Sequence, residues 1–148
     1  MARKRSTQGN HPREPGEKAP GKRPPTPVFY RYCLAEGWEI LAGRNDRDNE
    51  LLTGRTAGPN DYWFHVRGMP GSHVILRHGA LEDAERDILR AAAAVAAYHS
   101  KARGGGTVAV SCTRAKYVRK PRGAKDGTVA IRKETVLKVS PELPSPPG

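Results

Sequence analysis

Between residues 28 and 80, short apolar runs alternate with polar turns, which is typical of β-strands. Strands are predicted over residues 28–34 and 38–42, around a turn at Glu36-Gly37. Two more are predicted over 61–67 and 72–77. In residues 61–67, Tyr62, Phe64 and Val66 fall on one face and the intervening polar and aromatic side chains on the other. The first face is a candidate core, and the second has the mixed character of a binding face.

The strongest helical pattern covers residues 81–102, where apolar side chains recur every three or four positions. These positions are Leu81, Ala84, Ile88, Ala91, Val95, Tyr98 and Ala102. Acidic residues stand in the first turns, and Lys101 and Arg103 stand at the end before three glycines, which suits the helix dipole. The many alanines predict close packing against a sheet. A shorter helix is predicted over 46–52, with Asn45 as its N-cap.

Four further strands are predicted over residues 107–112, 116–119, 128–132 and 135–139. The last two are expected to form a hairpin through Lys133-Glu134. The pattern as a whole predicts a single small α+β domain over residues 28–140, with about eight short, mostly antiparallel strands and one long and one short helix.

The two ends of the chain have a different composition. Residues 1–27 hold six of the thirteen prolines and no Ile, Leu, Val or aromatic residue. Such a segment cannot bury enough apolar surface to offset its ordering entropy, so we expect a disordered basic arm. Residues 141–148 include four prolines and are expected to form a short loose tail.

Charge is concentrated in two places. Of the net +11, residues 1–27 contribute +5 (seven basic, two acidic), and residues 101–125 contribute +8 with no acid at all. Residues 28–100 carry eight basic and ten acidic groups, a net charge of −2. Clustered cations of this kind favour a polyanion partner. An acidic membrane is disfavoured, because neither basic segment forms an amphipathic helix with large apolar anchors.

Several protein classes are excluded or disfavoured by composition. No apolar run approaches the ~18 residues of a membrane helix, and the basic start has no apolar segment after it. Two cysteines, Cys33 and Cys112, allow at most one disulfide. We therefore expect a cytoplasmic location. No motif indicates a metal or another cofactor.

A series of motifs resembles the NFACT-R domain, an RNA-binding module. The motifs are Gly43-Arg44-Asn45 with Asn49-Glu50-Leu51-Leu52, residues 61–65 (Asp-Tyr-Trp-Phe-His), 70–75 (Pro-Gly-Ser-His-Val-Ile), 94–103 and 116–127. They occur in the family's order and span about residues 28–142. In larger members this domain is the C-terminal part of ribosome-quality-control factors, which bind the large ribosomal subunit and tRNA. The chain looks like a stand-alone form of the domain, so the resemblance implies contact with tRNA or large-subunit rRNA. The tailing activity of the larger factors is not implied for the domain alone.

The candidate RNA-binding residues combine these motifs with the basic segment. They are Arg44, Asn45, Asn49, His65, Arg67, Ser72, His73, Lys101, Arg103, Lys116, Arg119, Lys120, Arg122 and Lys125. RNA backbones require cations and splayed bases require flat side chains, and both occur in residues 101–125. Each motif also has a structural interpretation: Asn45 as a cap, Asn49 as a brace, residues 61–67 as a half-exposed strand, and the basic loop as a solvated surface.

Catalysis is disfavoured by the same pattern. Ser72 and His73 are adjacent in a predicted strand, so their side chains point to opposite faces and cannot form a nucleophile–base pair. The chain is therefore expected not to be an enzyme. Two other hypotheses remain open: an adaptor that binds a ribosomal or quality-control protein through residues 28–100, and an RNA-processing hydrolase that uses His65 or His73.

The basic arm generates the first prediction. Deleting residues 1–27 is expected to leave the melting temperature unchanged and to weaken RNA binding mainly at low salt, because flexible cations attract phosphates through a screened, sequence-independent interaction. Thermal unfolding and RNA titrations at two salt concentrations measure both effects. A large loss of thermal stability would show that the arm belongs to the fold.

Overall fold

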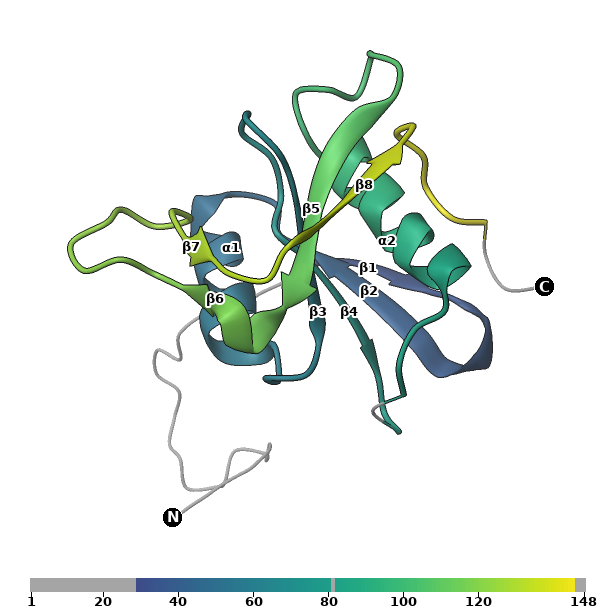
Figure 1. The fold of residues 1–148 in the computed structure, drawn as a ribbon, viewed down its shortest axis with the longest axis horizontal. Helices are drawn as coiled ribbons and strands as arrows, with labels where there is room; N and C mark the ends of the chain where they lie inside the picture. Colours follow the sequence, from purple (N-terminus) through teal and green to yellow (C-terminus); the bar gives the residue numbers. More distant parts are fainter. Residues whose placement is uncertain (1–28, 81, 146–148) are drawn as a thin grey trace, which may run out of the picture.

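A six-stranded antiparallel sheet forms the frame of the protein in the computed structural model, which describes residues 29–80 and 82–145 (Figure 1). The strand order is β1-β2-β4-β3-β5-β8. The strands are β1 Tyr30–Cys33, β2 Trp38–Ala42, β3 Tyr62–Val66, β4 Val74–His78, β5 Val108–Arg114 and β8 Thr135–Val139. Two short strands, β6 Val118–Arg119 and β7 Ala130–Ile131, pair with each other as a separate ribbon.

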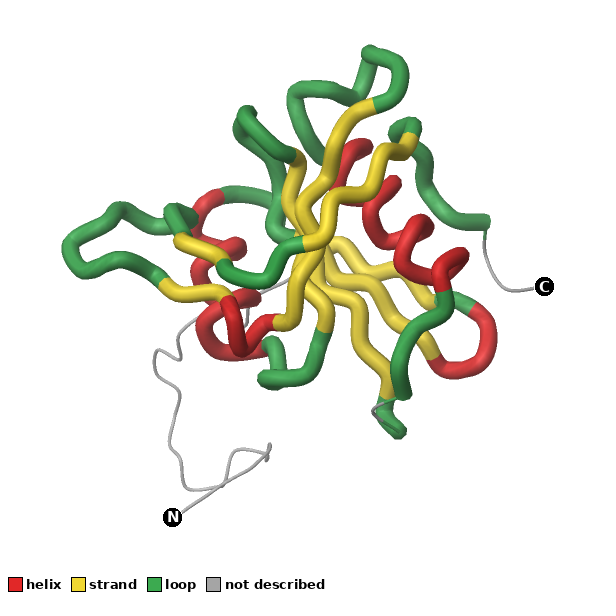
Figure 2. Tube along the Cα trace, in the orientation of Figure 1, coloured by secondary structure: helices red, strands yellow, loops and turns green. Residues whose placement is uncertain are grey.

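Helices and helical turns fill the connections (Figure 2). The α-helices are α1 Asp46–Leu51 and α2 Arg86–Tyr98. Single helical turns are η1 Ala35–Gly37, the π-type turn η2 Leu52–Thr56 that continues α1, and η3 Ala115–Tyr117. The predicted α+β class with two helices and eight strands is confirmed. No helix in the described part of the chain is both long and apolar enough to cross a membrane.

The larger core lies between α2 and one face of the sheet. Residues 92–97 of α2, five alanines and Val95, are all buried against strands that contribute Ile40, Phe64 and Val74. Small side chains let the helix axis come close to the sheet, so that the large strand residues fill the space between them. The predicted close packing of the alanine-rich helix is confirmed.

A smaller core covers the opposite face of the sheet. Leu41, Trp63 and Ile75 point to this side, and Leu52 of η2 packs on them. The ribbon covers them further through partly buried residues that include Ile131. Trp63 therefore lies inside a second core and not on an open binding face, which corrects the interpretation of the alternating pattern in residues 61–67.

The long helix is shorter than the sequence predicts. It begins after Glu85, because the preceding segment makes tertiary contacts instead: the Ala84 N–H donates to the Tyr62 hydroxyl (3.1 Å) and Asp83 pairs with Arg114 (2.8 Å). It ends at Tyr98, because His99 leaves the helical conformation (φ −93°, ψ 43°). The segment after it turns back, and Ser100 forms an isolated bridge with Gly71.

The predicted hairpin between the last two strands is wrong. β7 pairs with β6 (Val118 opposite Ile131), and β8 pairs with β5. The two cores explain this choice, because Ile131 belongs to the smaller core and Leu137 of β8 to the larger one. Between them Lys133 takes a left-handed conformation (φ 56°), which directs the chain from one core to the other.

The structure describes only one of the two predicted ends of the domain in detail. The proposed arm, residues 1–27, lies outside the described residues. At the other end the domain continues beyond residue 140, because the Glu142 N–H donates to the Ala94 carbonyl (3.3 Å) and Leu143 packs against the larger core.

Two glycines provide a matched test of the packing. A Cβ atom at Gly43 would overlap the side-chain oxygen of Asn49 and lie 3.0 Å from its backbone nitrogen, whereas at Gly54 it would meet nothing within 4 Å. We expect Gly43→Ala to lower the free energy of unfolding by about 1–3 kcal/mol. Gly54→Ala, in a helical segment, should raise it by about 0.5–1 kcal/mol. Urea denaturation measures both, and equal effects would contradict the packing described.

Candidate functional site

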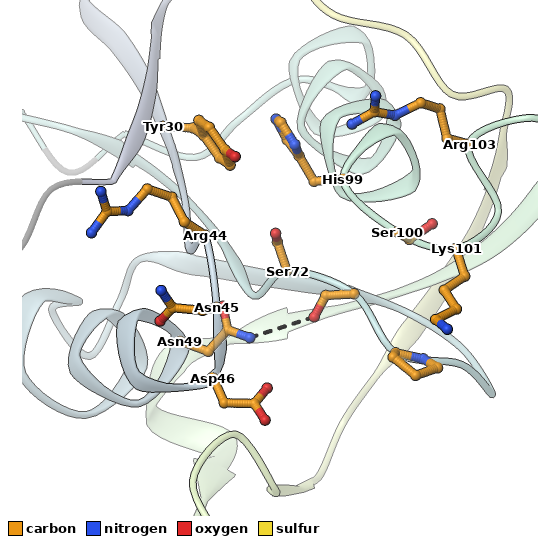
Figure 3. A pocket seen from close by; sticks show the side chains of 12 residues that line it. Tyr30, Arg44, Asn45, Asp46, Asn49, Ser72, His99, Ser100, Lys101 and Arg103 are labelled. Atoms are coloured by element: carbon orange, nitrogen blue, oxygen red, sulfur yellow. Dashed lines mark hydrogen bonds between the residues drawn. The ribbon is translucent and has the colours of Figure 1, made fainter.

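A cavity of about 350 Å³ opens where the start of β1, the β2–α1 connection, the approach to β4 and the end of α2 meet (Figure 3). We call it the basic pocket. Six of the predicted site residues line it: Arg44, Asn45, Asn49, Ser72, Lys101 and Arg103. They come from three segments that are far apart in the sequence, so the fold itself brings these motifs together.

A pair of stacked rings, Tyr30 and His99, forms one wall of the basic pocket. Their centroids are 4.3 Å apart and their planes differ by 6°. The Tyr32 hydroxyl and His99 Nε2 share a hydrogen bond of 2.6 Å, and the Tyr98 ring meets the imidazole edge-on. Sequence reasoning missed Tyr30 and His99, because neither belongs to a motif that pairs them and only the tertiary fold does so.

His99 and the Tyr32 hydroxyl bonded to it are uncharged at neutral pH. Burial, and next the charge of Arg103, lower the pKa of His99 to about 4. Burial also raises the pKa of Tyr32, followed by smaller effects of Tyr30 and Tyr98. The pocket therefore combines a neutral, flat aromatic surface with cations at its rim.

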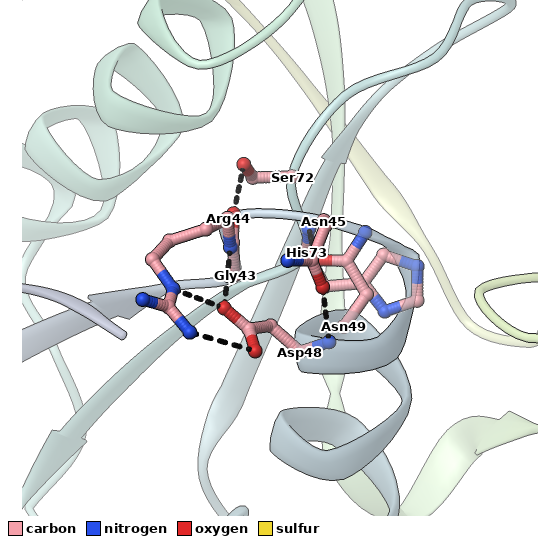
Figure 4. Close-up of polar contacts among 7 residues, drawn as sticks. All are labelled: Gly43, Arg44, Asn45, Asp48, Asn49, Ser72 and His73. Carbon is pink, nitrogen blue, oxygen red and sulfur yellow. Dashed lines mark hydrogen bonds and ion pairs between the residues drawn. The ribbon is translucent and has the colours of Figure 1, made fainter. Parts of the chain in front are cut away.

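Each arginine of the basic pocket is held in place. Arg44 bonds to Asp48 through Nε (2.5 Å) and Nη2 (3.3 Å), and its hydrogen bond lowers the pKa of that carboxyl group (Figure 4). Arg103 lies 4.0 Å above the Tyr98 ring and donates from Nε to the Tyr98 carbonyl (2.7 Å). Within the described residues, neither Lys101 nor Arg103 forms an ion pair.

Asn45, Asn49 and Ser72 have a structural role in addition to their place in the wall (Figure 4). The Asn45 side chain accepts a hydrogen bond from the Asp48 N–H and so caps α1, as predicted. Asn49 Oδ1 accepts from the His73 N–H (3.0 Å), and Ser72 Oγ donates to the Gly43 carbonyl (2.5 Å). These bonds fasten the β2–α1 connection to the start of β4.

His65, Arg67 and His73 line a different cavity, of about 410 Å³, beside the ribbon. The predicted site residues are thus divided between two cavities. His73 Nδ1 lies 2.7 Å from Thr53 Oγ1 and Nε2 lies 3.1 Å from the Gly127 carbonyl, while the two imidazoles meet edge-on at 5.5 Å. Arg67 pairs with Glu134 (3.6 Å).

Ser72 and His73 confirm the predicted alternation. Ser72 lines the basic pocket and His73 the other cavity, and each side chain is hydrogen-bonded to a different part of the protein. They do not form a catalytic pair. Among residues 29–80 and 82–145, no three metal-binding side chains cluster.

The predicted basic segment does not form one continuous face. Lys101 and Arg103 precede β5 at the basic pocket, and Lys116 follows it beside the Tyr117 ring (5.5 Å). The seven residues of β5 separate them by about 23 Å, at ~3.3 Å per residue. Lys116 therefore stands apart from the pocket, in a cluster in which Arg132 and Lys133 also approach Tyr117.

The loop between β6 and β7 contacts α1 next to the basic pocket. Lys120 pairs with Glu50 of α1 (3.3 Å) and with Asp126 (3.1 Å), and these contacts raise its pKa. The Gly127 N–H donates to Glu50 (3.3 Å), and Gly127 lies against Asp46, which lines the pocket. The other predicted cations of this loop are exposed and form no ion pair within the described residues: Arg119, Arg122 and Lys125.

Residues 28–133 match the family model described as the NFACT protein RNA binding domain. This stretch is more than two thirds of the chain, and the motifs around the basic pocket fall within it. The chain belongs to this family of small α+β domains.

Individual relatives agree with the assignment. The protein named Rqc2 homolog RqcH from Bacillus subtilis is 38% identical over 95% of this chain, and the one from Streptococcus suis is 38% identical over 75%. A solved structure, the C-terminal part of the fibronectin/fibrinogen-binding protein from Streptococcus suis, is 35% identical to this chain and superposes with a TM-score of 0.73. The match covers 85% of this chain and 50% of the chain in that structure. The chain spans about a quarter of the Bacillus relative and a fifth of the Streptococcus one.

The buried histidine at the second cavity generates a prediction about pH. Burial, and next the nearby His65, lower the pKa of His73 to about 4, whereas an unfolded chain binds the proton near 6.5. Between these values only the unfolded state is protonated at this residue. The free energy of unfolding should therefore fall as the pH drops from 6.5 to 4, by about 1.4 kcal/mol per pH unit from His73 alone.

Denaturation at several pH values, together with an NMR titration of the His73 ring, measures this effect. His73→Gln should remove its share of the pH dependence, whatever its effect at neutral pH. A His73 titration midpoint near 6.5 would contradict the burial described.

Proposed function

We propose that this protein binds RNA through the basic pocket and the neighbouring β6–β7 loop. The observation that carries the proposal is the convergence of cations from separate segments on one aromatic-walled cavity. Arg44, Lys101 and Arg103 stand at its rim, and the loop that carries the exposed cations is attached to α1 through Lys120 and Gly127. Cations that contact phosphates, beside flat side chains that contact bases, are the combination that RNA binding requires.

The family supports the same function. Its model is described as an RNA binding domain, and relatives that are 35–38% identical carry the name Rqc2 homolog RqcH. We propose that the chain contacts tRNA or rRNA of the large ribosomal subunit in the cytoplasm, as part of the quality control of stalled translation. In this proposal the protein acts by binding and not by catalysis.

The roles of individual residues follow from their contacts. Arg119, Arg122 and Lys125 are exposed and are proposed to contact phosphates. Lys120 is engaged by two carboxylates, so its main role is to hold the loop on α1. Asn49 and Ser72 shape the basic pocket through their hydrogen bonds to the backbone.

The test is the salt dependence of RNA affinity in a triple variant, Arg119→Ala/Arg122→Ala/Lys125→Ala. Each phosphate contact contributes about 0.7 to the slope of log affinity against log salt on single strands and about 0.9 on duplex. Loss of three contacts should lower the slope by about 2–3 units. Lys120 is kept in this variant, so that the loop stays attached to α1.

A second triple variant is the matched control. Arg86→Ala/Arg90→Ala/Lys138→Ala removes the same charge from α2 and β8, and its slope should change much less than that of the loop variant. Equal changes in both variants would show that net charge alone governs binding. An unchanged slope in the loop variant would favour the adaptor hypothesis, in which a protein partner binds instead.

A further inference from the structure

We propose that the basic pocket holds one unpaired nucleotide of the RNA, with its base stacked on Tyr30. This inference rests on the proposed function and specifies the part of the RNA that the pocket takes. The first observation is the exposure of Tyr30: 41% of the residue is accessible, although the other face of its ring is covered by His99. One aromatic face is therefore supported from behind and still open to a ligand.

Several contacts hold the support behind Tyr30 in place. His99 is held by its hydrogen bond to Tyr32, and by the edge of Tyr98, which in turn carries the guanidinium of Arg103. A base that stacks on Tyr30 would extend an existing column of parallel rings. A preordered stacking surface loses little conformational entropy on binding, which is why such surfaces serve single strands of any sequence.

The rim of the basic pocket supplies the groups that a nucleotide needs besides its base. Figure 3 shows Arg44 beside Tyr30, and Arg103 and Lys101 on the far side of His99. Arg44 thus lies on the side of Tyr30 where a base would stack and can contact its phosphate, while Arg103 and Lys101 lie beyond His99, where the RNA strand would continue. Asp46 stands across the pocket from the rings (Figure 3) and can accept a hydrogen bond from a ribose hydroxyl.

The size of the cavity favours a single nucleotide over a helix. Its volume of about 350 Å³ is near the lower end of the ~300–1,000 Å³ of small-ligand sites. A base inside a duplex has both faces stacked on its neighbours, so neither is free to meet Tyr30. The pocket therefore selects RNA with an extruded, looped or unpaired terminal nucleotide.

The test compares Tyr30→Leu with the wild-type protein on two fluorescent RNAs, a single-stranded octamer and a blunt duplex, by anisotropy at constant salt. We expect Tyr30→Leu to weaken binding of the single strand by about 10-fold or more, since a stacked base is lost. Binding of the duplex should change less than 2-fold, and Tyr30→Phe should bind both RNAs like the wild type. Val136→Ala truncates another exposed apolar side chain, on β8, and should bind the single strand like the wild type.

Each other outcome overturns the inference in a recognisable way. An equal loss on both RNAs, or on the single strand for Val136→Ala as well, would mean that no base stacks specifically in this pocket. Binding of free AMP as tight as that of the octamer would assign the pocket to free nucleotides instead of RNA. Failure of the wild-type protein to bind either RNA would refute the proposed function itself, and this inference with it.

Discussion

The buried side chain of Asn49 is the contact on which both cavities depend. Its oxygen accepts the N–H of His73 and its amide group lies 3.5 Å from the Gly71 carbonyl, so one side chain fixes the chain on both sides of Ser72. The Gly43 N–H donates to the carbonyl of the same His73, and the Asn49 side chain leaves no space for a side chain at Gly43. A buried amide with one lost partner would cost about 1–3 kcal/mol, so this arrangement is strongly determined.

The two residues that follow Gly71 face different cavities. Ser72 faces the basic pocket, and His73 faces the second cavity, where it contacts Thr53 and the backbone of Gly127. The same short segment therefore sets the wall of the pocket and anchors the basic loop on the opposite side. Lys120 holds the loop a second time, through its ion pair with Glu50 of α1. The same carboxyl group accepts the Gly127 N–H.

Local patterns in the sequence were sufficient to predict the class of fold, most of its elements and the cap of α1. The alternation around Phe64 and the alanine periodicity of α2 both arise because one face of each element packs in the larger core. The Asn45 cap is local as well, because its partner is three residues away. The stacking of Tyr30 on His99 and the pairing of Lys120 with Glu50 join residues about 70 positions apart, and no local signal encodes them. The sequence pattern also failed to predict that β7 pairs with β6 and β8 with β5, because this pairing depends on which of the two cores accepts each apolar side chain.

The walls of the basic pocket come from four segments between Tyr30 and Arg103, and this has a consequence for stability. A ligand seated there touches parts of the chain that are together only in the native state, so it binds the folded form alone. Occupancy then adds RT ln(1 + [L]/Kd) to the unfolding free energy, about 2.7 kcal/mol when the ligand is at 100 times Kd. RNA would therefore act on this small domain as a folding cofactor, and its resistance to heat and proteases would report how much RNA it carries.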